Sequence, residues 1–147
     1  MKILVVGDSC KDIFVYGSIS RLSPEAPVPV IVPMHQKENP GMASNVAANL
    51  IALGADADLL TNTKQIKKIR FVDERYNHMV LRVDEGDKCE RISNVDIDYS
   101  QYSAVIVSDY CKGFLEIEDI VHISKKSTCP VFLDTKKDLG SLINKTY

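Results

Sequence analysis

Short apolar runs that end in a polar residue recur along the chain and predict the strands of a parallel sheet. They lie at Lys2–Val6, Asp58–Thr61, Ala104–Asp109 and Val131–Asp134. Continuous apolar runs of this length are typical of strands that are buried on both faces. Before the last run, apolar residues at helical spacing predict a helix from about Glu116 to Lys126. The order of strand, helix and strand predicts an α/β fold with a mostly parallel sheet and helices on its faces.

Two other segments predict strands outside that sheet. Residues 15–33 contain four of the six prolines but end in β-branched residues, which favours an extended edge segment over a plain surface loop. Residues Ile66–Val72 and Met79–Asp84 predict a hairpin that turns at Glu74–Asn77.

A glycine turn at Pro40-Gly41 leads directly into a predicted helix that ends at Gly54. Gly41 permits unusual backbone angles and a close approach of a ligand, and the free amides of a helix start favour an anionic or hydroxyl-rich ligand. Asn45 and Asn49 lie one turn apart on one face. The apolar stripe expected opposite them consists of Val46, Ala47, Leu50, Ile51 and Leu53. An ordinary buried crossover helix, with asparagines that bond nearby backbone, is the alternative interpretation.

Aspartates follow the predicted strands. Asp8 and Asp12 are expected in the loop after the first strand, and Asp109 and Asp134 end two later strands. Because ligands gather at the carboxyl ends of strands in open α/β sheets, Asp8 and Asp12 are candidates for binding sugar hydroxyls. The strand ends at Asp8, Asp109 and Asp134 are expected to point polar groups to one rim. The alternative is turn chemistry, in which an aspartate bonds its own backbone.

Composition and charge exclude several classes of function. The 147 residues carry a net charge of −2 and include 45% hydrophobic residues, which is enough for one compact core. The charge distribution predicts no basic surface that would bind nucleic acid. The run of Lys64, Lys67, Lys68 and Arg70 is interpreted as a solvated face. No apolar segment reaches the length of a membrane span, so we expect a cytoplasmic protein. The four cysteines and three histidines lack metal-ligand spacing and predict no metal site.

Several motifs together resemble the amino-terminal half of the PfkB, or ribokinase-like, carbohydrate kinases, and within them the heptose 7-phosphate kinases. The most specific is Ser23-Pro24-Glu25-Ala26-Pro27-Val28-Pro29-Val30. Others are Gly7-Asp8, Pro40-Gly41 with Asn45, Leu81-Arg82-Val83-Asp84 and Ser108-Asp109-Tyr110. The matches extend from residue 3 to about residue 137, and nearly the whole chain is covered.

The resemblance implies a Rossmann-like α/β core with a small β lid, formed by segments of about 14–33 and 66–84 inserted in a single domain of residues 1–147. It implies a homodimer joined through the lid, and ATP and Mg²⁺ as cofactors of the complete enzyme. The family's sugar contacts map to Asp12, Gly41 and Asn45, with Asp8, Arg21, Arg82 and Asp109 as weaker candidates. Lys136 maps to a phosphate-binding position, although Thr135 replaces the family's proline before it.

Three departures from the family pattern change the functional expectation. The Gly-Ala-Gly-Asp turn with the catalytic aspartate does not occur, so no catalytic residue is assigned and the isolated chain is expected to be nearly inactive. A strand and helix of the relatives are skipped between Thr61 and Lys67, and Met42 replaces a second glycine. Two hypotheses remain. The chain is either the sugar-binding half of a kinase whose nucleotide half is a separate partner, or a non-catalytic sugar-phosphate-binding or dimerisation protein.

Overall fold

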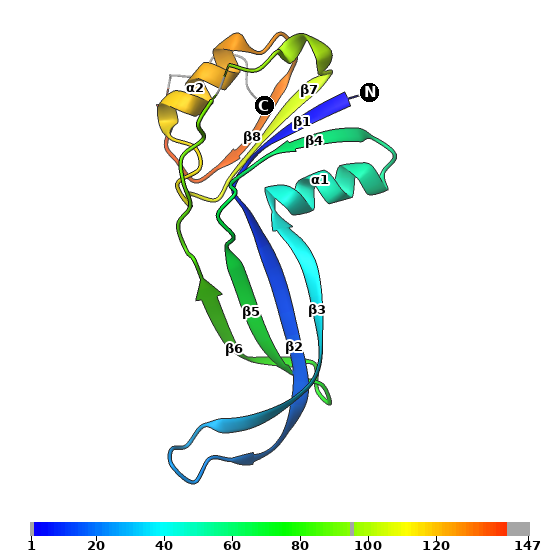
Figure 1. Cartoon of the computed structure of the whole chain (residues 1–147), viewed down its shortest axis with the longest axis vertical. Helices are drawn as coiled ribbons and strands as arrows, with labels where there is room; N and C mark the ends of the chain where they lie inside the picture. The colour runs from blue at the N-terminus through cyan, green and yellow to red at the C-terminus, as the bar shows by residue number, and fades with distance from the viewer. Residues whose placement is uncertain (1, 95, 141–147) are drawn as a thin grey trace.

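The computed structural model describes residues 2–94 and 96–140, which form two four-stranded sheets. The core sheet has the order β4-β1-β7-β8 and is parallel throughout. The lid sheet has the order β3-β2-β5-β6 and projects from one end of the core, as Figure 1 shows. A parallel sheet with a separate group of extended segments is the architecture that the sequence predicts.

The core sheet forms from the expected apolar runs. Its strands are β1 (Lys2–Gly7), β4 (Asp56–Leu60), β7 (Ala104–Asp109) and β8 (Val131–Thr135). The small residues of α1 (Ala43–Ala52) pack on one face around Val5. On the other face, α2 (Ile117–Lys126) and the segment before it bury Leu4 and Val107. Helices therefore lie on both faces of this sheet, while Leu59 of β4 and Phe132 of β8 remain 38% and 46% exposed.

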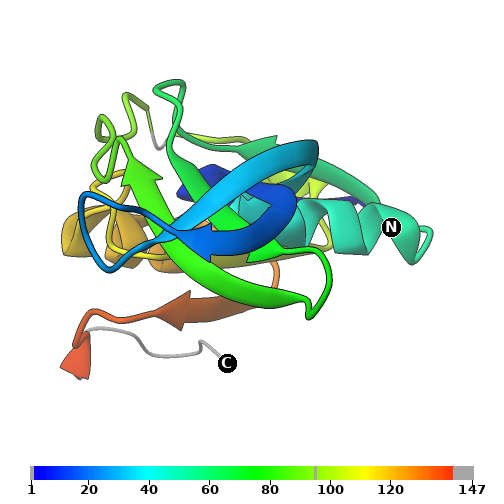
Figure 2. The ribbon, with the colours of Figure 1, turned by 90° about the horizontal axis from the view of Figure 1, so that it is seen from below.

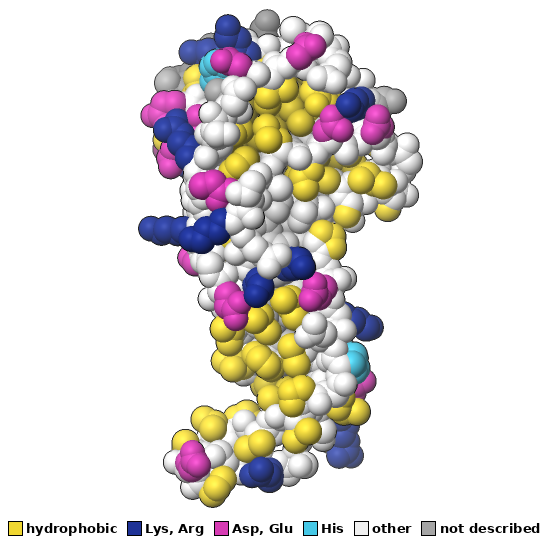
Figure 3. Space-filling model, viewed as in Figure 1, with side chains coloured by type: hydrophobic (Ala, Val, Ile, Leu, Met, Phe, Trp, Pro, Cys, Tyr) yellow, Lys and Arg dark blue, Asp and Glu magenta, His cyan; other side chains and the backbone are white. Residues whose placement is uncertain are grey.

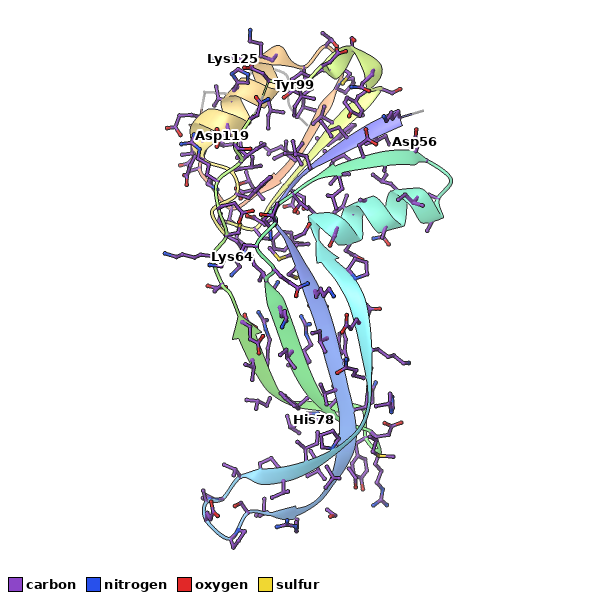
Figure 4. The ribbon with its side chains drawn as sticks, viewed as in Figure 1. Asp56, Lys64, His78, Tyr99, Asp119 and Lys125 are labelled. Carbon is purple, nitrogen blue, oxygen red and sulfur yellow. The ribbon has the colours of Figure 1, made fainter. Side chains whose placement is uncertain are left out.

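Loop contacts close the second face of the core. Arg91 donates from Nε and a terminal guanidinium nitrogen to the carboxylate of Asp119 in α2, at 2.8 and 2.9 Å. The same carboxylate accepts the amide of Glu116, so it also caps α2. Near the short helix η1 (Tyr99–Gln101), the hydroxyl of Tyr102 donates to Asp58 on β4. Asp119 and Tyr99 lie at the α2 end of the molecule in Figure 4.

The lid sheet consists of two long strands and a shorter hairpin. The long strands are β2 (Ser9–Leu22) and β3 (Pro29–Met42), and the hairpin consists of β5 (Lys67–Asp73) and β6 (His78–Glu85). The β2–β3 and β5–β6 pairs are antiparallel, whereas β2 and β5 run parallel. Register shifts after Tyr16 and Ile19 coincide with a bend, and Figures 1 and 2 show the tip of the β2–β3 hairpin turning across the lid.

Three details correct the expectations. Asp12 lies within β2 and not in a loop, because the chain turns at Gly7-Asp8 and pairs with β3 from Ser9 onward. The strands of the lid therefore begin at Ser9 and continue to Met42, beyond the expected 14–33 segment. In α1, Ile51 and Leu53 are 58% and 85% exposed instead of completing the buried stripe, because the helix contacts the sheet through Ala43 and Ala47.

Gly54 ends α1 as expected. Its φ of +85° is in the left-handed region, and its amide donates to the carbonyl of Ile51, while the amide of Ala55 donates to that of Leu50.

Candidate functional site

Asp12 and Gly41 come together where the lid joins the core. They lie on neighbouring strands, with Cys10 directly opposite Gly41 in the register. A side-chain carbon added at Gly41 would collide with the carboxylate of Asp12 and would lie 2.6 Å from Cys10 Sγ. Glycine is therefore required here for space, since its own φ is not in the left-handed region. The two residues that carry the sugar-site prediction form one small, partly open patch.

Met42, the next residue, adopts the unusual backbone conformation expected for a glycine. Its φ is 62° and its ψ is −133°, a combination that side chains rarely adopt. The side chain does not protrude from the turn. It is buried against Cys10 and Ile66, with Cys89 beside them. The turn into α1 is therefore strained but packed, and the amide of Ala43 at the helix start donates to the Asp8 carbonyl at 2.9 Å.

The carboxylate of Asp12 is paired with Arg70 on the adjacent strand β5. The guanidinium carbon of Arg70 also lies 5.0 Å from the ring centroid of Phe14. Arg82 on β6 binds Asp84 through two hydrogen bonds of 2.6 Å. These hydrogen bonds are the main cause that raises the pKa of Arg82 and lowers the pKa of Asp84. Because these side chains are at alternate positions on three paired strands, they share one face of the lid sheet. We call it the polar face; its residues are Asp12, Phe14, Lys68, Arg70, Arg82 and Asp84.

Asp8 is a structural group. Its side chain is 0% exposed, and its carboxylate accepts the amides of Tyr110 at 2.7 Å and Phe114 at 3.2 Å. The thiol of Cys89 lies 3.8 Å from the same carboxylate. The pKa of the Cys89 thiol is raised to about 11, first by burial and second by the charge of Asp8. Both oxygens of Asp8 therefore serve the chain itself, which excludes it from direct contact with a sugar.

Asp109 is also occupied by donors of the chain itself. Its buried carboxylate accepts Lys137 Nζ at 2.7 Å, Thr135 Oγ1 at 2.6 Å and the amide of Cys111 at 3.0 Å. Burial alone would raise the pKa of Asp109, but these three donors together lower it. Lys136 is exposed, and Asp134 is exposed as well. The strands β1, β7 and β8 end at the same edge of the parallel sheet, as predicted, but two of the three strand-end carboxylates are buried within the fold and the third faces solvent.

The remaining candidates separate into two groups. Asn45 is exposed in the first turn of α1, close in sequence to Gly41, and Arg82 lies on the polar face. Arg21 is nine residues beyond Asp12 on β2, which corresponds to about 30 Å along the strand. Arg21 is exposed near the tip of the lid sheet, and it lies far from Asp12 of the same chain.

Sequence reasoning missed Lys68, Arg70 and Tyr110. The ammonium of Lys68 lies 5.6 Å from the ring centroid of Tyr110 and so links the lid to the loop after β7. The missed signal is the alternation in β5, which directs Lys68 and Arg70 to the face of Arg82 and Asp84, and Lys67 to the other face.

Neither a metal centre nor a membrane helix is found in the described part of the chain. Within residues 2–94 and 96–140, no group of three or more histidine, cysteine or acidic residues is arranged to hold a metal ion. No helix in these ranges is long and apolar enough to span a bilayer.

Comparison with known proteins identifies related sequences and folds. No family model matches the chain. The bifunctional protein HldE of Vibrio cholerae is 32% identical over 91% of this chain, which spans 35% of HldE. A putative phosphofructokinase from Staphylococcus aureus has a similar fold, with a TM-score of 0.59 and 10% identity over 97% of this chain and 56% of that structure. A carbohydrate kinase from Agrobacterium tumefaciens has a TM-score of 0.53 and 13% identity over 90% of this chain and 52% of that structure.

The chain is similar in sequence to the HldE proteins and similar in fold to solved carbohydrate kinases. It spans about a third of the length of the HldE relatives and about half of the solved kinases. The HldE alignment extends over 169 residues, more than the 147 of the whole chain. The HldE protein therefore contains residues within the aligned region that this chain lacks.

In this chain, residues 61–66 form a short link between β4 and β5. Its position is fixed by Glu90, whose carboxylate accepts the amide and the hydroxyl of Thr63. Hydrogen bonds with backbone and with Thr63 lower the pKa of Glu90 to about 2. Lys64 lies in this link at the junction of the two sheets, as Figure 4 shows. The link holds β5, and with it Arg70, against the candidate site.

Proposed function

We propose that these residues form the sugar-binding side of a carbohydrate kinase that phosphorylates a sugar or a sugar phosphate of the heptose phosphate type. The observation that carries the proposal is the contact between Asp12 and Gly41 at the helix start. A carboxylate accepts hydrogen bonds from sugar hydroxyls, and the missing side chain at Gly41 leaves the space that the Asp12 carboxylate occupies. Asn45 supplies an exposed amide beside them.

Asp12 is held by Arg70 in the absence of a sugar, and this pairing is part of the proposed site. Both side chains are only about one fifth exposed, so the ion pair is partly shielded from water. A carboxylate has room for several hydrogen bonds, so Arg70 orients Asp12 and still leaves acceptor positions for hydroxyl groups. Arg82 completes the polar wall on β6 in this proposal.

Phosphoryl transfer needs more than this site. It depends on positioning and charge stabilisation of the nucleotide, and in the family the catalytic aspartate belongs to a Gly-Ala-Gly-Asp turn that does not occur in these 147 residues. ATP and Mg²⁺ are the cofactors that we expect for the complete kinase, and we assign neither to the described residues. The nucleotide-binding part is therefore proposed to come from outside these residues, and the chain alone is expected to show almost no turnover.

Binding and turnover test this proposal separately. Isothermal titration calorimetry with a heptose 7-phosphate should give saturable heat for the wild type and much weaker binding for Asp12→Ala and Asn45→Ala. Identical heats for all three proteins would exclude a sugar site at these residues. Turnover is then measured with ATP and Mg²⁺, with and without a nucleotide-binding half supplied as a separate chain. Absence of turnover in every combination would contradict the kinase assignment.

The opposite face of the lid supports a homodimer as a second function. We call it the apolar face; its residues are Ile13, Val15, Ile69, Phe71, Leu81 and Val83. Figure 3 shows a continuous hydrophobic patch over this part of the lid, bordered toward the core by charged side chains. The pairs Lys11–Glu38 and Lys67–Glu85 lie on that border.

The apolar face also contains a groove. Val28, Pro29 and Ile31 of the bent hairpin tip line it together with Phe71, Val80 and Leu81. An exposed apolar surface of this kind, rimmed by charges, is typical of a protein interface. We propose that a second copy of the lid covers it, in a dimer that forms with or without catalysis. Light scattering at micromolar concentration tests this, and a strict monomer would contradict it.

A further inference from the structure

The strand β4 forms one edge of the core sheet, and among the described residues it pairs with β1 alone. The amides and carbonyls on its outer side therefore have no neighbouring strand in the described part of the chain. A row of unpaired backbone groups of this kind is a template for pairing with another chain. The outer edge of β4 is thus a candidate interaction surface, and its side chains decide which partner fits.

One side of this edge is apolar. The helix α1 packs beside β4 and carries no charged residue, and Ile51 and Leu53 near its end are exposed. Leu59 of β4 is partly exposed on the same side, because it is in register with Val5, which packs against α1. An added strand would cover apolar surface here that the chain itself leaves open to water.

The other side of the edge is acidic. Asp58 is in register with Leu4, which packs on the α2 side, and Asp56 lies two residues away on the same side. The carboxylate of Asp58 is held by Lys2 at 2.8 Å and by the hydroxyl of Tyr102 at 2.7 Å. Asp56 is exposed, and within the described residues no cation pairs with it. Figure 4 shows Asp56 where β4 begins, beside the turn that follows α1.

These charges discriminate between possible occupants. A second copy of the chain, paired antiparallel and centred on Asp58, would place the two Asp58 side chains opposite each other. Like charges at opposite positions destabilise a pair of strands, whereas opposite charges stabilise it. Because side chains alternate along a strand, a segment with a cation facing Asp56 places its neighbouring residue on the side of Leu59. A segment in which basic and apolar residues alternate therefore matches both sides of the edge.

We propose that the outer edge of β4 binds an extended segment of a partner protein in which basic and apolar residues alternate. The segment adds a fifth strand to the four-stranded core sheet. Its main chain pairs with the outer backbone groups of β4, its basic side chains lie beside Asp56, and its apolar side chains cover Leu59. This surface belongs to the core sheet and is independent of the proposed sugar site and of the lid dimer.

An NMR titration of the ¹⁵N-labelled chain with two capped peptides as long as β4 tests this. In one peptide lysine and valine alternate, and in the other glutamate replaces lysine. The lysine peptide should give saturable shifts of the amides of Asp56–Leu60 and should slow their exchange with solvent, as backbone pairing requires. The amides of β8 should stay unchanged, and the glutamate peptide should not bind. No binding, equal binding of both peptides, or shifts without slower exchange would overturn the proposal.

Asp56→Lys tests the charge directly. It should weaken binding of the lysine peptide by about 5-fold or more, because an attractive cross-strand pair becomes repulsive, and it should allow the glutamate peptide to bind. Asp56 is exposed, so the variant should fold as the wild type does. Glu25→Lys is the matched control, since it makes the same change of charge at an exposed residue between β2 and β3. It should bind both peptides as the wild type does. Equal losses in both variants, or no loss in Asp56→Lys, would contradict a site at this edge.

Discussion

The two sheets of this chain differ in how far helices cover their apolar surface. The core sheet is covered on both faces, by α1 around Val5 and by α2 with the segment before it around Val107. The lid sheet has no helix on either face (Figure 1). One of its faces carries ion pairs and the other leaves Leu81 54% exposed. Helices of the same chain therefore cover much of the apolar surface of the core sheet, whereas they leave that of the lid sheet open.

The same contrast separates the acidic groups. Asp8 and Asp109 in the core are enclosed and fully engaged by donors of the chain. Asp12 and Asp84 on the lid are paired with arginines but remain partly open to solvent. Acidic residues that resemble each other in sequence thus divide into enclosed and partly exposed groups according to the sheet that carries them.

The largest effect is expected from a comparison of Asp8→Ala with Asp12→Ala. Asp8→Ala leaves two buried amides, of Tyr110 and Phe114, without acceptors and should reduce the free energy of unfolding by about 4 kcal/mol. Asp12→Ala should reduce it by less than about 1 kcal/mol, because this ion pair is close to the surface. Urea denaturation measures both. Equal losses would mean that the core and the lid do not differ as described.

Asp109→Asn should be the next most damaging substitution. It leaves the ammonium of Lys137 without its buried partner, at a cost of about 3 kcal/mol near neutral pH. Because the pKa of Asp109 is lowered in the folded state, its contribution is present above its ordinary pKa of 3.8 and is lost as the pH falls through the lower folded value. The difference between wild type and variant in unfolding free energy should therefore shrink below about pH 4. A difference that is constant with pH would contradict this.

Leu81→Lys tests the apolar face of the lid. It should convert the proposed dimer into a monomer and remove the dependence of the melting temperature on protein concentration. Met79→Lys is the control, because Met79 is 51% exposed on the same strand but pairs with Val72, whose side chain lies on the other face. Sedimentation velocity should show the dimer in this control. Dissociation in both variants would argue against an interface on the apolar face.

The smallest effect is expected for Met42→Gly. It relieves a strained φ, which is worth about 1–3 kcal/mol, but loses the buried side chain, which is worth about 2 kcal/mol. The two effects should offset each other to within about 1 kcal/mol in the free energy of unfolding. Met42→Ala keeps the strain and loses the packing, so it should be clearly less stable than Met42→Gly. The reverse order in thermal denaturation would contradict the strain.

The sequence predicts the elements better than their contacts. The apolar runs, the hairpin and the capped helices are local signals, and they are confirmed within a few residues. The position of Asp12 in a strand was not predictable in this way, because it depends on pairing with a segment almost thirty residues away. The same holds for the contact between Lys137 and Asp109, which the path of the chain after β8 decides. Arg70 reaches Asp12 through a strand pairing that no local pattern reveals.

The most direct test of the proposed sugar site is an NMR titration of the ¹⁵N-labelled chain with a heptose 7-phosphate. The account predicts saturable shifts of the backbone amides of Asp12, Gly41 and Lys68, with the amides of α2 and β8 unchanged. Shifts confined to α2 and β8, or no shifts at all, would contradict a sugar site between the lid and the core.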